Sequence, residues 1–211
     1  MHQDGTIELF QYWNRLRGDR AAPTRTEVEP ADIRRLLADT FILELDATGA
    51  ASFRLAGTRL CAAYGRELKG VGFDELWRGR DQAVVARLVR CASDDQSVVV
   101  VTFAGSTARE RTLDFEMLLV PLAGSTPGPR LLGVIQPAKR PYWLGADPIV
   151  VNRLDSLRVV DPDREPLFLA NRPPIPVPPL APEPDAIVPA ASRPRRIRHL
   201  LVLDGGRRED D

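Results

Sequence analysis

Proline is distributed very unevenly along this chain of 211 residues. Of its 19 prolines, 11 lie between Pro162 and Pro194. Proline has no backbone N–H group, so a segment this rich in it can neither continue a helix nor complete a strand ladder. We expect that stretch to be extended and solvated. The packed core must therefore come from the residues before it, roughly 6–160.

Composition and charge narrow the classes of protein further. Hydrophobic residues make up 44% of the chain, which is enough for a core, and 29 basic residues balance 29 acidic ones. A neutral chain gives no electrostatic reason to expect nucleic acid or an anionic membrane as a partner. The apolar runs are far shorter than the roughly 20 residues of a membrane span, and the first residues lack the regions of a signal peptide. We expect a cytoplasmic protein.

Hydrophobic periodicity predicts helices first and strands later. Apolar residues at three- and four-residue spacing indicate a first helix capped by Thr6 and ended by Gly18, and a short second helix that begins at Pro30. Alternating apolar and polar residues predict five strands. A short helix and a longer one, 81–92, separate the second strand from the third. The strands are expected at 40–46, 52–56, 97–104, 112–121 and 130–136.

The order of these elements decides the fold class. A doubly wound sheet requires strands that alternate with helices, whereas this chain has three consecutive strands near its end. Strands joined by short connections usually pair antiparallel. The expected fold is α+β, with one five-stranded antiparallel sheet and helices on one face. An N-terminal helical extension precedes it, and a proline-rich disordered C-terminal tail follows it.

Several short phrases, in this order, resemble a PAS-like family known mainly from alphaproteobacteria. The resemblance covers about residues 6–138, and the succession of phrases is more specific than any one of them. The phrases are Tyr12-Trp13, Pro23-Thr-Arg25, Pro30-x-x-Ile33-Arg34, Phe53-Arg-Leu-Ala-Gly-Thr-Arg-Leu60, Gly65-Arg-Glu-Leu-Lys-Gly70, Leu118-Leu-Val-Pro-Leu122 and Leu132-Gly133.

The resemblance implies a PAS-like fold and a role in bacterial signal transduction, with no attached kinase or cyclase. We divide the chain into a helical extension (1–39), a PAS-like domain (40–145), an extended proline-rich linker (146–194) and a basic and apolar C-terminal segment (195–211). We expect a sensory or regulatory protein that contacts a partner protein. Two alternatives stay open: a ligand-free interaction adaptor, and a small α+β enzyme of the isomerase or cyclase kind.

A PAS fold can hold a small apolar ligand between the concave face of its sheet and the covering helices. The large apolar side chains expected there could equally form an ordinary core, because protein interiors are normally filled. Both interpretations stay open. The candidate pocket residues are Phe41, Leu43, Phe53, Leu55, Leu60, Tyr64, Trp77, Val85, Leu88, Phe103, Phe115 and Met117.

Two arginines, Arg59 and Arg66, flank the short helix near the expected mouth of this pocket. A guanidinium group binds a carboxylate or phosphate through two parallel hydrogen bonds, so either arginine could anchor an acidic ligand. Alternatively, both pair with nearby acids such as Glu67, Asp74 or Glu75. The sequence supports both roles.

The domain has few residues of the types that usually bind a cofactor. Both histidines, His2 and His199, lie outside the domain, so a histidine-ligated heme is not expected. Neither Cys61 nor Cys91 stands in the motif of cysteine-linked flavin domains, and both are expected to be small buried helix residues. A zinc site lacks ligands. We expect no cofactor and no metal.

No catalytic residue is assigned, and an enzyme is not expected. The one pair of acids that invites such a role is Asp114 and Glu116, which share a face of a predicted strand. Two carboxylates in such a position could serve as acid and base. A solvated sheet face is the simpler explanation, and we expect both side chains to face water.

The first helix is apolar around much of its circumference, which is more than one docking face needs. We expect such a helix to cover a partner surface, most simply a second copy of the chain in a two-fold dimer. The candidate interface residues are Leu9, Phe10, Tyr12, Trp13 and Leu16.

Beyond the prolines the sequence becomes basic and then apolar. Such a segment can add as a strand to an open sheet edge, where backbone hydrogen bonds supply the affinity. Binding to an anionic surface, or no role at all, are the alternatives. The apolar residues of this candidate docking segment are Ile197, Leu200, Leu201, Val202 and Leu203.

Overall fold

The computed structural model describes residues 1–124, 128–160 and 163, together with the backbone of 195–197 and 200–202. The chain forms two compact units, Met1–Arg172 and Pro173–Asp211. The proline-rich stretch 164–194, and with it most of the predicted linker, lies outside the described residues.

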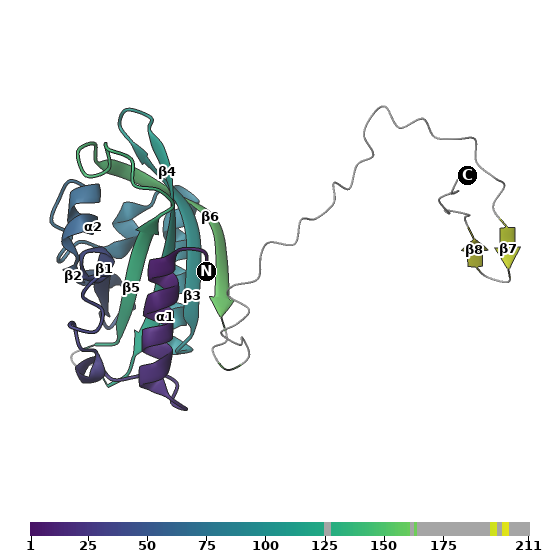
Figure 1. Cartoon of the computed structure of the whole chain (residues 1–211), viewed down its shortest axis with the longest axis horizontal. Coiled ribbons are helices and arrows are strands. Elements are labelled where there is room, and N and C mark those ends of the chain that lie inside the picture. Colours follow the sequence, from purple (N-terminus) through teal and green to yellow (C-terminus); the bar gives the residue numbers. More distant parts are fainter. Residues whose placement is uncertain (125–127, 161–162, 164–194, 198–199, 203–211) are drawn as a thin grey trace, which may run out of the picture. The chain divides into compact units, whose positions relative to one another are not determined.

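A six-stranded antiparallel sheet with the order β2-β1-β5-β4-β3-β6 forms the centre of the first unit (Figure 1). The α+β fold class is confirmed, and all five predicted strands are present, with one strand more than expected. The strands are β1 (Thr40–Leu45), β2 (Ala51–Ala56), β3 (Val98–Thr107), β4 (Thr112–Leu122), β5 (Arg130–Pro137) and β6 (Ile149–Val160).

The additional strand, β6, begins inside the region predicted to be linker. It pairs with β3 from Val98↔Val160 to Thr107↔Ile149, and two register shifts interrupt the pairing. Its partner lies far earlier in the chain, and the shifts break the alternation of apolar and polar residues on which strand prediction depends. The boundary of the folded unit predicted at residue 145 is therefore too early.

Within the described residues, three α-helices and three 3-10 helices accompany the sheet. The helix predicted at Pro30 is instead a series of turns that ends in a 3-10 helix, because its backbone bonds, such as Leu36 N–H to Ile33 O, mostly span three residues. Its pattern still buries Ile33 and Leu36. The helices are α1 (Asp4–Arg17), η1 (Arg25–Glu27), η2 (Leu37–Asp39), α2 (Thr58–Ala63), η3 (Phe73–Leu76) and α3 (Gly79–Asp94).

Helices cover both faces of the sheet, not one. The inner face packs with α2, η3 and α3 into a cluster that includes Phe41, Phe53 and Phe115. The outer face packs with α1 and the turns after it into a second cluster that includes Leu118 and Val120. Figure 1 shows α1 lying along the sheet. The N-terminal extension is therefore a layer of the domain.

The side chains predicted to form a dimer interface lie in this second cluster. Leu9, Phe10, Tyr12 and Trp13 are buried, and Leu16 is partly buried against them. The Trp13 indole Nε1–H donates to the Pro121 carbonyl oxygen at 2.8 Å. The residue-level prediction was wrong because the chain's own sheet, apolar on its outer face, takes the place of a second copy. A homodimer remains a prediction without an assigned surface.

Glu116 anchors the N-terminus of α1 to strand β4. Its side chain is buried, unlike that of Asp114, and it accepts hydrogen bonds from His2 N at 2.9 Å, Gln3 N at 3.0 Å and the Thr6 hydroxyl. A carboxylate at this end of a helix is also favoured by the helix dipole. The expectation that Glu116 faces water was wrong, because its carboxylate accepts these bonds from the start of α1. The expectation that Thr6 caps the helix was also wrong, because Gln3 is the N-cap and Thr6 lies within the first turn.

The second unit is described only as a short hairpin, in which β7 (Arg195–Ile197) pairs antiparallel with β8 (Leu200–Val202). Ile197 thus stands opposite Leu200, in place of the single strand predicted through Leu203, which lies outside the described residues. Addition of this segment to a sheet edge remains a prediction.

Replacing Glu116 should loosen α1. We expect Glu116→Ala to lower the free energy of unfolding by about 2–4 kcal/mol, because it removes the carboxylate that accepts from two backbone N–H groups and the Thr6 hydroxyl at the start of α1. The exposed acid two residues earlier provides the control, and Asp114→Ala should change stability by less than about 0.5 kcal/mol. Urea denaturation measures both. Equal effects of the two substitutions would contradict the anchoring role.

Trp13→Glu should destabilise the isolated fold and not merely separate two copies. A charge in this buried position should cost more than about 3 kcal/mol, whereas Gln11→Glu on the exposed side of the same helix should be nearly neutral. Thermal unfolding at several protein concentrations checks this. A loss that appears only at low concentration would instead support a dimer held together by α1.

Candidate functional site

Eleven of the twelve candidate pocket residues do lie together under the helices of the inner face. Leu88 is partly buried there, and the other ten belong to the buried inner cluster. The remaining residue, Leu55, is 46% exposed. The sequence pattern therefore identified the inner face correctly at every position except one.

A β-bulge explains why Leu55 departs from the prediction. Ile42 pairs with Leu55 and Leu43 pairs with Phe53, so Arg54 is an extra residue in β2. An extra residue reverses the alternation of side chains beyond it. Phe53 points to the inner cluster, while Leu55 joins Ile42 on the outer face.

Aromatic rings fill the space between the inner face and the helices. The ring centroids of Phe41, Phe53 and Phe73 lie 5.5–5.8 Å apart. Phe103 continues this packing, with its centroid 5.0 Å from Trp77 and 5.2 Å from Phe115. Such spacings are those of rings in direct contact. A ligand at this position would have to displace them.

A buried polar pair lies beside the inner cluster. The Asn152 Nδ2–H donates to the Tyr64 hydroxyl at 2.9 Å, and both residues are buried. Trp77 lies next to Asn152, because an isolated β-bridge joins the backbones of the two residues. The Asn152 Oδ1 and the Trp77 Nε1 are both buried, and neither has a hydrogen-bond partner among the described residues. Buried polar atoms without a partner commonly mark the place of a bound water or ligand atom.

Sequence reasoning missed Asn152 because it lies on β6, which was not predicted. The one available signal was an amide residue that directly follows the apolar run of Ile149, Val150 and Val151. In a strand, such a residue either faces water or needs an internal partner.

A cleft of about 310 Å³ opens beside this polar pair, and we call it the Tyr64 cleft. Arg66 lies on its wall, and its role as a ligand anchor remains a prediction. Arg78 donates from its guanidinium to the Glu75 and Trp77 carbonyl oxygens. The cleft is lined by Tyr64, Arg66, Glu75, Leu76, Arg78, Pro148, Ile149 and Val150.

The other candidate anchor, Arg59, has a structural role. It binds the buried Asp39 through two hydrogen bonds of 2.6 and 2.8 Å, and these bonds raise the pKa of the Arg59 guanidinium. Arg140 and Gln136 bind the same carboxylate at 3.0 Å each. Asp39 thus joins α2 to the end of β5, and Arg59 does not line the Tyr64 cleft.

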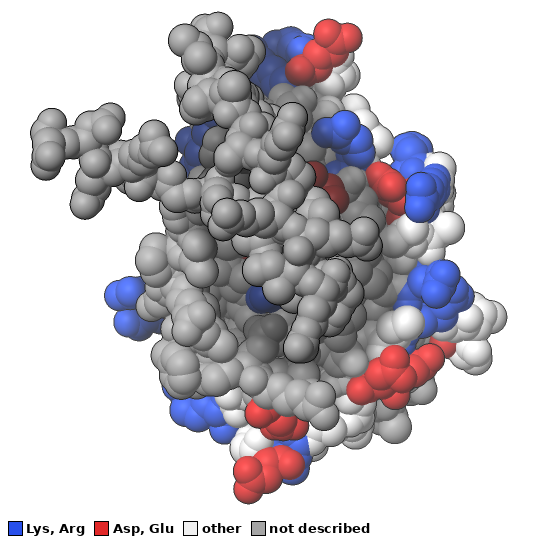
Figure 2. Space-filling model, turned by 90° about the vertical axis from the view of Figure 1, so that its right-hand side faces the viewer, with Lys and Arg blue, Asp and Glu red and all other residues white. Residues whose placement is uncertain are grey.

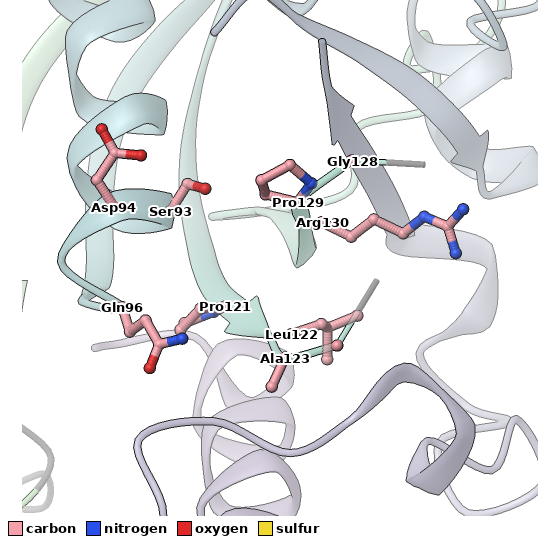
Figure 3. A pocket seen from close by; sticks show the side chains of 10 residues that line it. Ser93, Asp94, Gln96, Pro121, Leu122, Ala123, Gly128, Pro129 and Arg130 are labelled. Carbon is pink, nitrogen blue, oxygen red and sulfur yellow. The ribbon is translucent and has the colours of Figure 1, made fainter. Parts of the chain in front are cut away.

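A second groove of about 310 Å³ lies between the C-terminal end of α3 and the neighbouring ends of β4 and β5 (Figure 3). Figure 3 shows Asp94 and Gln96 on the helix side and Pro129 on the opposite side. The groove contains none of the candidate residues. Its lining is Ser93, Asp94, Gln96, Pro121, Leu122, Ala123, Gly124, Gly128, Pro129 and Arg130.

The residues considered for cofactors are scattered. Cys61 is half-buried, but Cys91 is exposed, because it lies on the side of α3 that turns away from the core, so its predicted burial was wrong. His199 lies outside the described residues. Within the described part of the chain, no group of three or more His, Cys, Asp or Glu side chains could hold a metal ion.

Charge is mixed over the surface that can be seen. Figure 2 shows basic and acidic side chains interspersed around the described part of one face. This distribution agrees with the balanced composition of the chain. Among the described residues, no helix is both long and apolar enough to span a membrane.

Tyr64 should make stability depend on alkaline pH. Burial raises its pKa above the ordinary value of about 10. Above pH 10 the unfolded chain releases this proton while the folded chain retains it, so the free energy of unfolding falls by about 1.4 kcal/mol per pH unit. Tyr64→Phe should lessen this fall, and the part that remains belongs to Tyr12, whose pKa is also raised by burial. Tyr142→Phe, at an exposed position, should leave the fall unchanged. Urea denaturation between about pH 9 and 11 measures the difference.

The chain is similar to one family of known proteins and to several solved structures. The family model described as "PAS domain" matches residues 1–136. Among solved structures, the PAS domain of an HTR-like protein from Haloarcula marismortui is 19% identical and covers 51% of this chain and 89% of its own, with a TM-score of 0.38. A LOV protein from Rhodobacter sphaeroides is 17% identical and covers 55% of this chain and 71% of its own, with a TM-score of 0.39.

A comparison with curated proteins finds no match. The family match begins at the first residue and ends near the end of β5, so it includes α1 and strands β1 to β5 up to residue 136, whereas β6 lies beyond it. It also spans more than half of the chain. The sheet, its covering helices and this match together show that the chain belongs to the PAS domain family.

Proposed function

We propose that this chain is a sensory or regulatory domain of a signalling pathway that acts through contact with a partner protein, by binding and not by catalysis. PAS domains are sensory and regulatory modules. The features of this domain favour a ligand-free adaptor, which binds a partner protein without holding a small molecule in its core. The observation that carries the proposal is the filled inner face. Phe41, Phe53, Phe73, Trp77 and Phe103 are each at most 1% exposed.

A domain whose core is filled must recognise its partners through its surface. A ligand of useful size needs a cavity of several hundred cubic ångströms that encloses most of it. The contacts between the rings argue against such a volume on the inner face, and the pocket of about 160 Å³ that borders Phe73 is smaller than such a ligand needs. Input and output must then both use the exterior of the domain.

A small polar ligand in the Tyr64 cleft is the second candidate. It is favoured by the position of Arg66 on the cleft wall. Such a ligand would carry an anionic group for the guanidinium. This role is also sensory, but the signal would be a metabolite and not a protein.

Native mass spectrometry of the full chain purified from its natural host separates the two candidates. The adaptor form predicts the bare polypeptide mass. A small adduct that disappears in Arg66→Gln, but not in the matched Arg87→Gln at an exposed position of α3, would support the metabolite sensor and overturn the adaptor proposal. Thermal-shift screening provides a second measurement, because any ligand bound by the native state raises the melting temperature.

Phe53→Ala should test whether the inner core is filled. Removal of a fully buried ring from a packed core costs about 3–5 kcal/mol of unfolding free energy. The neighbouring control, Leu55→Ala, lies on the exposed outer face and should cost less than about 1 kcal/mol. A small loss for Phe53→Ala would indicate an open pocket, in which the ring has few contacts.

A further inference from the structure

The β-bulge at Arg54 produces an open cleft on the outer face of the sheet. The cleft has a volume of about 320 Å³, and its floor consists of Ile42 and Leu55. Leu55 is one of the few large apolar side chains that are exposed among the described residues. Bulges are frequent at sheet edges, where they re-aim a side chain, and β2 is an edge strand.

Four cationic side chains surround this apolar floor, and they come from four different segments. Arg25 is supplied by η1, Arg54 by β2, Lys69 by the turn after α2 and Arg130 by the start of β5. The whole chain has no net charge, so this grouping is local and not a consequence of composition. We call the six residues the basic cleft.

One acid partly balances these cations. Glu44 lies 3.0 Å from the Arg130 guanidinium and 3.8 Å from that of Arg54. Among the described residues, the Lys69 ammonium has no salt-bridge partner, and the Arg54 side chain is mostly exposed. A surplus of positive charge therefore faces the solvent around an apolar centre.

This arrangement of apolar and charged residues is similar to that of a protein–protein interface. Such interfaces combine an apolar centre with a polar rim, and arginine is enriched in them. A small-molecule site would enclose most of its ligand, whereas the floor residue Leu55 is widely exposed. Single-stranded nucleic acid would require aromatic side chains for its bases, and the lining of this cleft contains none.

We propose that the basic cleft binds an acidic segment of a partner protein, with an apolar side chain of that segment on Ile42 and Leu55 and its carboxylates beside Arg25, Arg54 and Lys69. This inference rests on the proposed function through protein contact and names the chemistry of the partner. The attraction between rim charges is weakened by salt, because exposed charges are screened within about 10 Å at 0.1 M.

Fluorescence anisotropy with the full chain tests the proposal. The probe is a short labelled peptide of glutamates with a leucine at every third position. It should bind at least about tenfold more tightly than a peptide with every Leu replaced by Gly, or one with every Glu replaced by Gln, a difference of about 1.4 kcal/mol. It should also bind more tightly than an oligo(dT) of the same length. Added salt should weaken it.

Substitutions locate the binding on the chain. Arg54→Gln combined with Lys69→Gln should weaken the probe about tenfold, and Leu55→Ser about fivefold. Lys69→Gln alone, at an exposed side chain, should weaken it about threefold without affecting the fold. The matched control is Arg80→Gln combined with Arg87→Gln, which removes the same charge from the exposed side of α3 and should leave binding unchanged.

Three results would overturn the inference: equal binding to wild type and the cleft variants, equal binding of the leucine-free peptide, or tighter binding of the oligonucleotide. They differ from the result that would overturn the proposed function. A metabolite adduct in native mass spectrometry contradicts the adaptor role even if the peptide binds. A bare polypeptide without peptide binding leaves the adaptor role intact and moves its contact to another surface.

Discussion

Strand β4 is apolar on both faces, and the rest of the domain follows from this constraint. Met117 and Leu119 point to the inner cluster, and Leu118 and Val120 point to the outer one. A central strand of this kind must be covered on both sides. One layer of helices cannot do so, and α1 therefore packs against the outer face as an obligatory part of the fold.

Buried polar groups connect parts of the chain that are distant in sequence. Glu116 ties β4 to the first turn of α1, and Asn152 ties β6 to the end of α2 through Tyr64. An unpaired buried polar group is costly, so each bond specifies one arrangement of its segments. Apolar packing alone would tolerate small shifts of these elements. The polar contacts thus position α1 and β6, the two elements that extend the sheet and its layers beyond the predicted core.

The distribution of apolar surface has a consequence for recognition. Because α1 is used within the domain and aromatic rings fill the inner face, few large apolar side chains remain accessible in the described part of the chain. The basic cleft contains one of them, Leu55, and surrounds it with cations. A single extra residue, Arg54, is responsible for this surface.

Local signals in the sequence determined a large part of this protein. The period of apolar residues identified five strands, α1 and α3, and assigned eleven of the twelve inner-face residues correctly. Short phrases indicated the PAS relationship that the family match confirms. These features could be predicted because periodicity and turn residues act over a few neighbouring positions.

Only the tertiary structure decided which surface each element meets. The pairing of β6 with β3, the covering of α1 by the chain's own sheet and the burial of Glu116 all join residues far apart in sequence. A one-residue shift in register moved Leu55 to the opposite face. Such outcomes depend on which distant segments compete successfully for the same apolar surface and hydrogen bonds. A local sequence pattern cannot predict the result, because it depends only on neighbouring residues.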